Sequence, residues 1–249
     1  ETARLIASHY TEVVVAPDYS DEAQSVLSER KNLRVLRIAN MDRLSTFVGA
    51  KVVDYHSLLD GGVIVQWSAA PRPLSDEEME PARSDHKGVK HVIERVPTTE
   101  EARDLRMAWI VVSAVTSNSI VYVRGGVTVG IGTGEQDRVG AAEIARDKAV
   151  RKALEREAWR LHGTGFSELD EAKAGDVRKS VEEDCGGLRG AVMASDGFFP
   201  FRDGVDVGIR CGVTAVVQPG GSLRDWEVIE ACNENDVAMI FTGQRAFKH

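Results

Sequence analysis

Short apolar runs alternate along this chain with segments in which apolar residues recur at helical spacing. Short runs rich in β-branched residues are typical of strands, and the longer period is typical of helices. The pattern predicts strands at 13–15, 33–38, 62–66, 120–123, 127–131, 190–194, 214–217 and 237–241. It predicts helices at 21–29, 137–161 and 225–232, and a further helix that starts at Thr98. Strands that alternate with helices indicate an α/β fold.

Two local patterns refine this prediction. Thr98 is followed at the third helical position by Glu101, the arrangement of a capping box. The apolar residues behind this start that share one helical face, and that we expect to be buried, are Ala102, Leu105, Trp109 and Val112. Arg124-Gly125-Gly126 separates two β-branched runs and predicts a hairpin turn. From residue 72 to residue 87 the composition changes to Pro, Ser, Asp and Glu, which predicts a surface loop.

Composition limits the classes of protein that fit. The chain has 249 residues, 43% of them hydrophobic, enough for one large domain or two small ones. The formal net charge is -8 with both signs well mixed, so we expect neither nucleic acid nor an anionic membrane as the main partner. No apolar stretch is long enough to span a bilayer.

The cysteines and the first residues bear on location and completeness. Cys185, Cys211 and Cys232 are odd in number and lack metal-type spacing, so we expect no disulfide framework and a cytoplasmic location. The chain does not begin with Met, and residues 1–6 have the character of a helix interior. We expect Glu1 to be internal to a longer gene product or to abut a partner chain.

A Gly-rich loop at Gly130–Gly134 lies between a predicted strand and a predicted helix. Backbone N–H groups in such a loop can face an anion. The spacing is that of neither a Walker loop nor a dinucleotide fingerprint, so a structural turn is the alternative.

The segment Phe198–Asp203 combines three aromatic residues, a proline and an Arg-Asp pair where a strand ends. Ligands in α/β folds bind at the carboxyl ends of strands, and aromatic faces and a carboxylate suit a heterocycle with amino groups. The alternative is that the Phe side chains are core and that Arg202-Asp203 begins a helix.

Two weaker candidates lie nearer the C-terminus. Pro219–Ser222 joins a strand to a helix, and there Ser222 has the alternative role of a helix cap. Arg245 can bind phosphate or carboxylate through its planar guanidinium, although a terminal Arg is ordinarily solvated. The chain lacks the His-x-Glu and Pro-Cys-x-x-Cys signature of the zinc deaminases, so we expect no zinc.

Several of these segments together resemble the AICAR transformylase domain of the bifunctional purine-synthesis enzymes. The resemblance covers nearly the whole chain and is carried by residues 117–122, 129–134 with Arg138, 195–206, 218–222 with Arg224 and Asp225, and 241–243 with Arg245, Phe247 and His249. It is extended by shorter matches at residues 15–17, 31–34, 61–66 and 97–98.

The resemblance implies an α/β fold made of cytidine-deaminase-like, layered sheet-and-helix subdomains. Residues 1–95 would be the remainder of the first transformylase subdomain and residues 96–249 the second. The implied activity is formyl transfer from 10-formyltetrahydrofolate to the purine precursor AICAR, in IMP biosynthesis in the cytoplasm. Family active sites lie at a dimer interface, so the implied assembly is a homodimer, or a complex with a chain that carries the missing upstream half.

The resemblance also assigns roles to individual residues. Asn118 would lie near the amine and carboxamide of AICAR, and Phe198 and Arg245 would contact the nucleotide. The folate site would be lined by Phe201, Asp203 and Ser222. A potassium ion would lie near Ser117, Ser119 and Asp196. All six ligand-contacting residues should converge on one cleft, because each lies near a strand end and strands of one sheet share a rim.

Some positions depart from the family pattern. The family's catalytic Lys-His pair lies upstream of Glu1, and Lys90-His91 is not that pair because its surroundings match a strand leading to Pro97-Thr98. Glu135 and Asp137 stand where the family commonly has Gln and Ser, and the family's cation ligands near Ala114 and Lys248 are altered. The alternative functions are a non-catalytic nucleotide- or folate-binding module and a plain α/β scaffold subunit.

Overall fold

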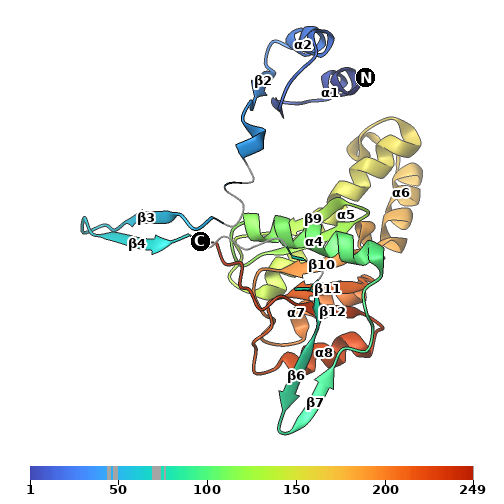
Figure 1. The fold of residues 1–249 in the computed structure, drawn as a ribbon. Coiled ribbons are helices and arrows are strands. Elements are labelled where there is room, and N and C mark those ends of the chain that lie inside the picture. Colours follow the sequence, from blue (N-terminus) through green and yellow to red (C-terminus); the bar gives the residue numbers. More distant parts are fainter. Residues whose placement is uncertain (44–45, 47–49, 69–73, 76, 249) are drawn as a thin grey trace. The chain divides into compact units, whose positions relative to one another are not determined.

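A computed structural model describes residues 1–43, 46, 50–68, 74–75 and 77–248 of the chain. The fold is mixed α/β (Figure 1). It divides into two compact units, Glu1–Val52 and Val53–His249. His249, part of the sequence resemblance, lies outside the described residues.

The first unit contains two helices and a parallel pair of strands. The helices are α1 (Thr2–Ser8) and α2 (Asp21–Ser28), and the strands are β1 (Val13–Ala16) and β2 (Arg34–Arg37), followed by the short helix η1 (Met41–Arg43). Ser20 caps α2 by accepting a hydrogen bond from the Ala23 N–H. The apolar residues left exposed on this strand pair and just after it are Val13, Val15, Leu36 and Ile38. Parallel strands are normally covered on both faces, so this small sheet presents an uncovered apolar face.

The second unit begins with a hairpin whose two faces differ sharply. Its strands β3 (Val53–Ser57) and β4 (Val63–Trp67) pair antiparallel, and every residue in both is exposed. One face carries the cross-strand pairs Val53–Trp67 and Tyr55–Val65, whereas the other face carries Asp54 opposite Gln66. Because successive residues point to opposite faces, the hairpin has one apolar face without a covering layer among the described residues.

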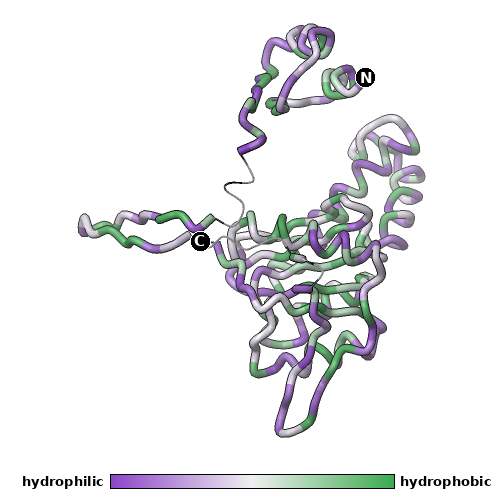
Figure 2. The backbone as a smooth tube through the Cα atoms, viewed as in Figure 1, coloured by the Kyte–Doolittle hydropathy of each residue, from purple (hydrophilic) through white to green (hydrophobic). Residues whose placement is uncertain are grey.

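The main sheet has six strands in the order β5-β12-β11-β10-β8-β9 (Figure 1). Its members are β5 (Glu80–Pro81), β8 (Ile120–Arg124), β9 (Val127–Gly132), β10 (Val192–Ser195), β11 (Ala215–Gln218) and β12 (Ala238–Phe241). Strands β10, β11 and β12 are mutually parallel, and β8, β9 and β5 each run antiparallel to their neighbours. Figure 2 shows apolar residues along these strands. The predicted positions of β8, β9, β10, β11 and β12 are confirmed to within two residues, whereas β5 was not predicted.

Helices cover both faces of this sheet, which makes three layers. On one face, Leu105 and Trp109 of α4 (Thr99–Ala114) pack in a core cluster with strand residues such as Val121. On the other face, the alternate strand residues, including Tyr122 and Met193, pack in a second cluster. That cluster takes its helical residues from α5 (Arg138–His162), α7 (Asp203–Arg210) and α8 (Asp225–Asn233).

Strand β9 and helix α5 approach closely because of two glycines in the Gly-rich segment. A Cβ added to Gly130 would overlap the backbone oxygen of Ala145, and one added to Gly132 would overlap that of Ala141. Any side chain at either position would push the helix off the sheet. Gly130 and Gly132 thus belong to strand β9, where they allow this close packing, and neither the predicted loop nor the alternative of a structural turn is correct at these two positions.

The local predictions around α4 are confirmed in most details. Thr98 accepts a hydrogen bond from the Glu101 N–H at 3.2 Å, and the Glu101 carboxylate accepts one from the Thr98 N–H at 2.8 Å. Leu105, Trp109 and Val112 are buried, whereas Ala102 is only partly buried. Arg124-Gly125-Gly126 does form the turn of a hairpin, and the Asp104 carboxylate accepts hydrogen bonds from both glycine N–H groups, at 2.7 and 2.8 Å.

The surface loop predicted for residues 72–87 is wrong over its second half, while residues 72, 73 and 76 lie outside the described residues. Strand β5 pairs with β12 at the sheet edge, and β6 (Arg83–His86) pairs with β7 (Val89–Val92) in a second hairpin. The charged side chains are mostly exposed, so the composition resembles that of a loop. Only Ala82, fully buried in the core, marks the strand pairing. Sequence patterns also missed helix α6 (Glu171–Glu183), which packs against α5.

The expectation of no disulfide is also wrong. Cys185 and Cys211 are joined by a disulfide, with their Cα atoms 5.5 Å apart, and Cys232 is free and buried. The two residues are separated by 26 positions, and folding brings the turn η3 (Cys185–Gly187) beside the end of α7. Spacing along the chain carried no sign of this proximity.

Candidate functional site

Several polar loops gather at one end of the strands of the main sheet, which we call the rim. The carboxyl ends of β10, β11 and β12 lie at the rim because the three strands are parallel. Strand β8 begins there, since its antiparallel register places Ile120 opposite both Ser195 of β10 and Gly132 of β9. Ligands of open α/β sheets bind at this end of the strands. This confirms that the strands near the expected site residues belong to one sheet.

A buried ion pair lies at the base of this rim. Asp196, which follows β10, is fully buried, and Arg138, the first residue of α5, is almost fully buried. The Arg138 guanidinium donates to the Asp196 carboxylate and also, through Nε, to the backbone oxygen of Phe198 at 3.4 Å. Burial lowers the pKa of the Arg138 guanidinium from its ordinary value, and the charge of Asp196 opposes that shift. The pair therefore holds opposite charges in a site with little water.

Asp196 also connects β8 to the C-terminal segment. Its carboxylate accepts a hydrogen bond from the Ser119 N–H at 3.2 Å, and its backbone oxygen accepts one from the Ala246 N–H at 2.9 Å. Ser117 and Lys248 exchange two further bonds, from the Ser117 N–H to the Lys248 backbone oxygen and from the Lys248 N–H to the Ser117 Oγ, both 2.9 Å. These contacts fix the chain end across the rim.

A cavity of about 300 Å³ opens above the ion pair. Its lining residues come from the start of β8, the start of α5, the loop after β10 and the chain end; they are Asn118, Gln136, Asp137, Arg138, Phe198, Pro200 and Phe247. Arg245 lies over the Phe198 ring at 5.3 Å and over the Phe247 ring at 6.0 Å. A cation held beside two aromatic faces can bind an anionic group next to a planar ring.

Asn118 is held at the mouth of this cavity by the loop before α5. Its side-chain Nδ2 donates to the Glu135 backbone oxygen at 3.0 Å, and its N–H donates to the same oxygen at 3.1 Å. The Ser117–Asn118 peptide bond is cis. The structure thus brings three of the expected site residues together, with Asn118 and Phe198 lining the cavity and Arg245 stacked on Phe198.

The other three expected residues do not line this cavity. Phe201 is 48% exposed and lies under the Arg224 guanidinium at 4.9 Å. The Ser222 Oγ accepts a hydrogen bond from the Arg224 N–H at 3.1 Å, so Ser222 and Phe201 share one neighbour. Asp203 is exposed at the first position of α7, and the helix start in the alternative interpretation of this segment is therefore correct. Of the three phenylalanines in this segment, Phe199 is fully buried in the core, whereas Phe198 and Phe201 are not core residues.

The loop that carries Ser222 is organised by Asp225. The Asp225 carboxylate accepts hydrogen bonds from the Gly221 and Ser222 N–H groups at 2.7 and 3.1 Å. Burial raises the pKa of Asp225, and the two N–H donors oppose that rise. Ser222 itself does not cap α8, for which no side-chain cap is present.

Sequence reasoning did not name five of the lining residues as site residues: Gln136, Asp137, Arg138, Pro200 and Phe247. Arg138 and Phe247 were noted only as members of matching stretches, although Arg138 lies over the Phe247 ring at 5.5 Å. The signal for Arg138 was its place just after a Gly-rich loop, at the first turn of a helix. Gly197 was a further signal, because a Cβ at that position would overlap both the Arg138 guanidinium and the Phe247 ring.

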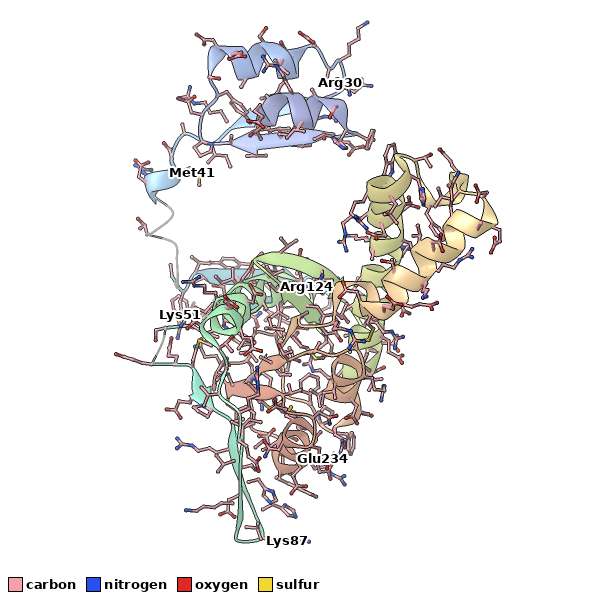
Figure 3. The ribbon with its side chains drawn as sticks, turned by 90° about the vertical axis from the view of Figure 1, so that its right-hand side faces the viewer. Arg30, Met41, Lys51, Lys87, Arg124 and Glu234 are labelled. Carbon is pink, nitrogen blue, oxygen red and sulfur yellow. A yellow bond between two sulfur atoms is a disulfide. The ribbon has the colours of Figure 1, made fainter. Side chains whose placement is uncertain are left out.

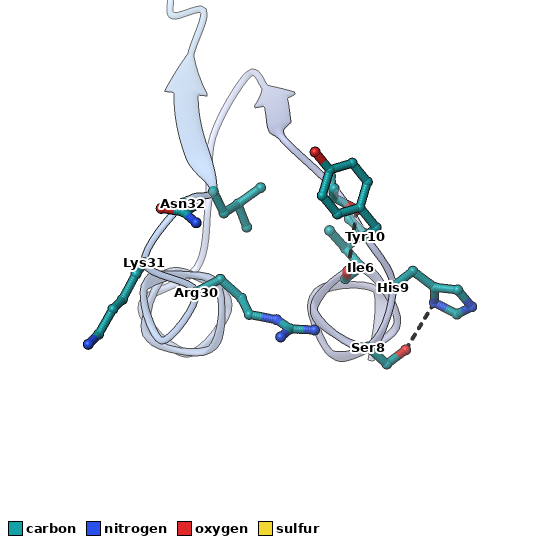
Figure 4. Close-up of a pocket in the computed structure, with 9 residues that line it drawn as sticks. Ile6, Ser8, His9, Tyr10, Arg30, Lys31 and Asn32 are labelled. Atoms are coloured by element: carbon teal, nitrogen blue, oxygen red, sulfur yellow. Dashed lines mark hydrogen bonds between the residues drawn. The ribbon is translucent and has the colours of Figure 1, made fainter.

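The first unit holds a separate cavity of about 400 Å³ (Figure 4). It lies between the end of α1 and the loop after α2, and Arg30 reaches across it to donate from Nε to the Ala7 backbone oxygen at 2.6 Å. Ser8 and His9 are engaged with each other and with the Leu5 backbone oxygen. Ser8, His9 and Arg30 are thus already engaged in hydrogen bonds within the chain, which leaves them few donors and acceptors for a ligand.

The described ranges of the chain contain neither a group of metal-binding side chains nor a membrane-spanning helix. No three His, Cys, Asp or Glu side chains within them are grouped to hold a metal ion. No helix in the same ranges is long and apolar enough to cross a membrane.

The three-layered sheet with a polar, aromatic-lined cavity at its rim defines an α/β protein with a candidate small-molecule site. Comparison with known proteins narrows this class. The family model described as "AICARFT/IMPCHase bienzyme" matches residues 1–148. The chain belongs to the AICARFT/IMPCHase bienzyme family.

Individual relatives agree along the whole chain. It is 39% identical over 249 residues to the "Bifunctional purine biosynthesis protein PurH" of Aquifex aeolicus, covering 100% of the chain and 38% of that protein. It is 42% identical over 249 residues to the protein of the same name from Acidithiobacillus ferrooxidans, covering 100% of the chain and 39% of that protein. The chain thus spans less than two fifths of the length of these curated relatives.

The buried ion pair makes a prediction about stability. Arg138→Met should lower the free energy of unfolding by about 3–5 kcal/mol, because it leaves the Asp196 carboxylate buried and unpaired. The double variant Arg138→Met/Asp196→Asn should lose about 1–3 kcal/mol less than the sum of the single losses. Urea denaturation followed by circular dichroism measures all three variants.

Arg160→Met serves as a control, because Arg160 and Glu157 form an ion pair at the surface of α5. That loss should stay within about 1 kcal/mol. An Arg138→Met variant as stable as the Arg160→Met control would contradict the buried-pair account.

Proposed function

We propose that this chain is part of a formyltransferase that transfers the formyl group of 10-formyltetrahydrofolate to AICAR in purine (IMP) biosynthesis. The observation that carries the proposal is the rim cavity, where Asn118, Phe198 and Arg245 meet in a protein of this family. An aromatic face beside a guanidinium suits a planar base attached to a phosphate-bearing sugar. The names of the PurH relatives support a role in purine biosynthesis.

The folate would bind beside the nucleotide, at Phe201, Asp203 and Ser222. Phe201 is 48% exposed, so part of its side chain is accessible to a pterin, and Asp203 is an exposed carboxylate that can accept bonds from amino and ring N–H groups. Ser222 lies on a loop fixed by Asp225, so its position is set before a ligand arrives. Asn118 would orient the amine and carboxamide of AICAR.

Catalysis would also need a Lys-His pair that these residues do not supply. The His91 Nδ1 lies 2.9 Å from the Glu230 carboxylate and its ring lies beside Trp226 on α8, and His91 does not line the rim cavity. We propose that an upstream segment of the same polypeptide, or a partner chain in a dimeric assembly in the cytoplasm, brings the pair.

The uncovered apolar faces support the need for further polypeptide. The β1–β2 pair exposes Val15 and Leu36. The β3–β4 hairpin exposes Tyr55 and Trp67, each of which is 67% exposed. An isolated two-stranded hairpin is marginally stable in water and needs a further layer. We propose that residues 1–95 are the remainder of one transformylase subdomain, of the cytidine-deaminase type, and residues 96–249 the second.

The second candidate function is a non-catalytic module that binds the nucleotide or the folate. It is favoured by the same observation on His91, because the rim cavity without a Lys-His pair can bind but lacks a group to deprotonate the amine. The two functions differ in turnover and agree in binding.

Binding by single-site variants tests both candidates. Arg245→Ala should weaken AICAR binding, and Asp203→Asn should weaken folate binding, each by about 1.5–3 kcal/mol, because each removes a charge-assisted hydrogen bond. Each variant should leave the other ligand's affinity nearly unchanged. Isothermal titration calorimetry measures the four affinities, with the exposed Arg210→Ala on α7 as a matched control. Unchanged affinities in both variants would defeat the site assignment.

Turnover separates the enzyme from the module. The chain alone should transfer formyl slowly, and adding a polypeptide that carries the Lys-His pair should raise the rate about a hundred- to ten-thousandfold. The spectroscopic assay follows tetrahydrofolate release at saturating AICAR. If AICAR binds and no added family polypeptide produces turnover, the module is the correct function.

Potassium would bind near Ser117, Ser119 and Asp196. The Asp196 Oδ2 is buried without a hydrogen-bond partner in the described structure, and both serines are buried, so oxygen ligands are at hand. Thermal melts in potassium should exceed those in lithium at equal ionic strength by a few degrees, since only the larger ion suits such a site. Equal melting temperatures in the two salts would remove potassium from the proposal.

A further inference from the structure

The disulfide between Cys185 and Cys211 joins two segments that differ in access to solvent. Cys185 lies in the turn η3 after α6 and is partly exposed. Cys211 follows the last residue of α7 and is only 6% exposed. A reagent in solution therefore meets the sulfur of Cys185 first.

The turn that carries Cys185 is held by contacts that do not involve sulfur. Arg124, labelled in Figure 3, donates twice to the Asp184 carboxylate at 2.8 and 3.0 Å, and the Gly187 N–H donates to the Asp184 backbone oxygen at 2.9 Å. Gly186 packs so tightly on α5 that an added Cβ would lie 2.7 Å from the Val150 Cα. These contacts hold the turn of Cys185 in place after the bond opens. The Gly190 N–H donates to the Gly212 backbone oxygen at 2.8 Å and keeps the segment after Cys211 nearby, so the bond can form again.

Three arginines lie near this turn together with the Asp184 carboxylate, which is paired with one of them, Arg124. A Cβ built on Gly187 would lie 3.8 Å from an Arg156 Nη and 3.9 Å from an Arg124 Nη, and one built on Gly212 would lie 3.6 Å from an Arg189 Nη. Nearby guanidinium groups stabilise a thiolate, which is the leaving group and the nucleophile of disulfide exchange. They also attract an anionic thiol such as glutathione.

The third cysteine lacks each of these properties. Cys232 is fully buried, and burial raises the pKa of its thiol to about 12, so it stays protonated and out of reach. It provides an internal control for any reagent that modifies thiols.

We propose that Cys185 and Cys211 form a reversible thiol–disulfide site that exchanges with small anionic thiols through Cys185. A glutathione thiolate attacks the Cys185 sulfur, the bond to Cys211 breaks, and Cys211 leaves as a thiolate that takes up a proton. A second glutathione thiolate then attacks the glutathione sulfur of the mixed disulfide, which yields oxidised glutathione and the Cys185 thiolate. Two electrons pass to the protein, and the reverse sequence returns them to oxidised glutathione.

The site has a structural consequence for α7. The helix begins at Asp203 and ends beside Cys211, so the disulfide ties its far end to the turn that packs on α5. Reduction should loosen α7 and lower the melting temperature by several degrees, as expected when a native cross-link opens.

Thiol counting on the full chain tests the proposal. After equilibration with oxidised glutathione, unfolding and alkylation should label one thiol, that of Cys232; after equilibration of the native chain with millimolar reduced glutathione, they should label three. Returning the reduced chain to oxidised glutathione should restore one. Three labelled thiols in oxidised glutathione would overturn the proposal, as would a disulfide that survives reduced glutathione in the native chain.

Matched variants test the direction of exchange. With oxidised glutathione, Cys211→Ser should trap glutathione on Cys185 as a mixed disulfide and release one reduced glutathione, with the adduct detected by intact-mass and peptide mass spectrometry. Under the same conditions Cys185→Ser should leave the buried Cys211 largely unmodified. Cys232→Ser should respond to glutathione as the unchanged chain does. Equal adduct formation in the first two variants would overturn entry through Cys185.

Discussion

The buried ion pair between Arg138 and Asp196 is the constraint on which the candidate site depends. It joins the start of α5 to the end of β10, and Asp196 in turn holds Ser119 before β8 and Ala246 in the chain end. Four segments distant in sequence thus meet at one residue, Asp196. Removing either charge leaves the other without its partner in a site that excludes water, which costs far more than a surface pair would. The cavity above it owes its shape to this arrangement.

The order of strands explains why the site could be foreseen in outline. The alternation of apolar runs and helical segments located the strands of the main sheet closely, and strand ends near Asn118, Phe198 and Arg245 pointed to one rim. The contacts within the rim could not be foreseen. They depend on the antiparallel register of β8, and on the small size of Gly197, which makes room for Arg138.

Other features escaped the sequence for identifiable physical reasons. Strand β5 is itself an edge strand and pairs with β12 through two residues only, too few for a periodic pattern. Cys185 and Cys211 become neighbours only after α7 packs beside η3, so spacing along the chain gave no warning. The six expected site residues formed one set in sequence reasoning, whereas only Asn118 and Phe198 of them line the cavity, with Arg245 stacked on Phe198. Each of these features depends on contacts between residues that are distant in sequence.

The central claim is that the rim above the Arg138–Asp196 pair receives the nucleotide. Hydrogen–deuterium exchange with and without saturating AICAR measures this over the full chain. The account predicts slower hydrogen exchange in residues 117–119, 196–201 and 244–248. It predicts no change in the hairpin turn at Gly125, which lies at the opposite end of the strands. Protection confined to that turn, or no protection while calorimetry reports binding, would contradict it.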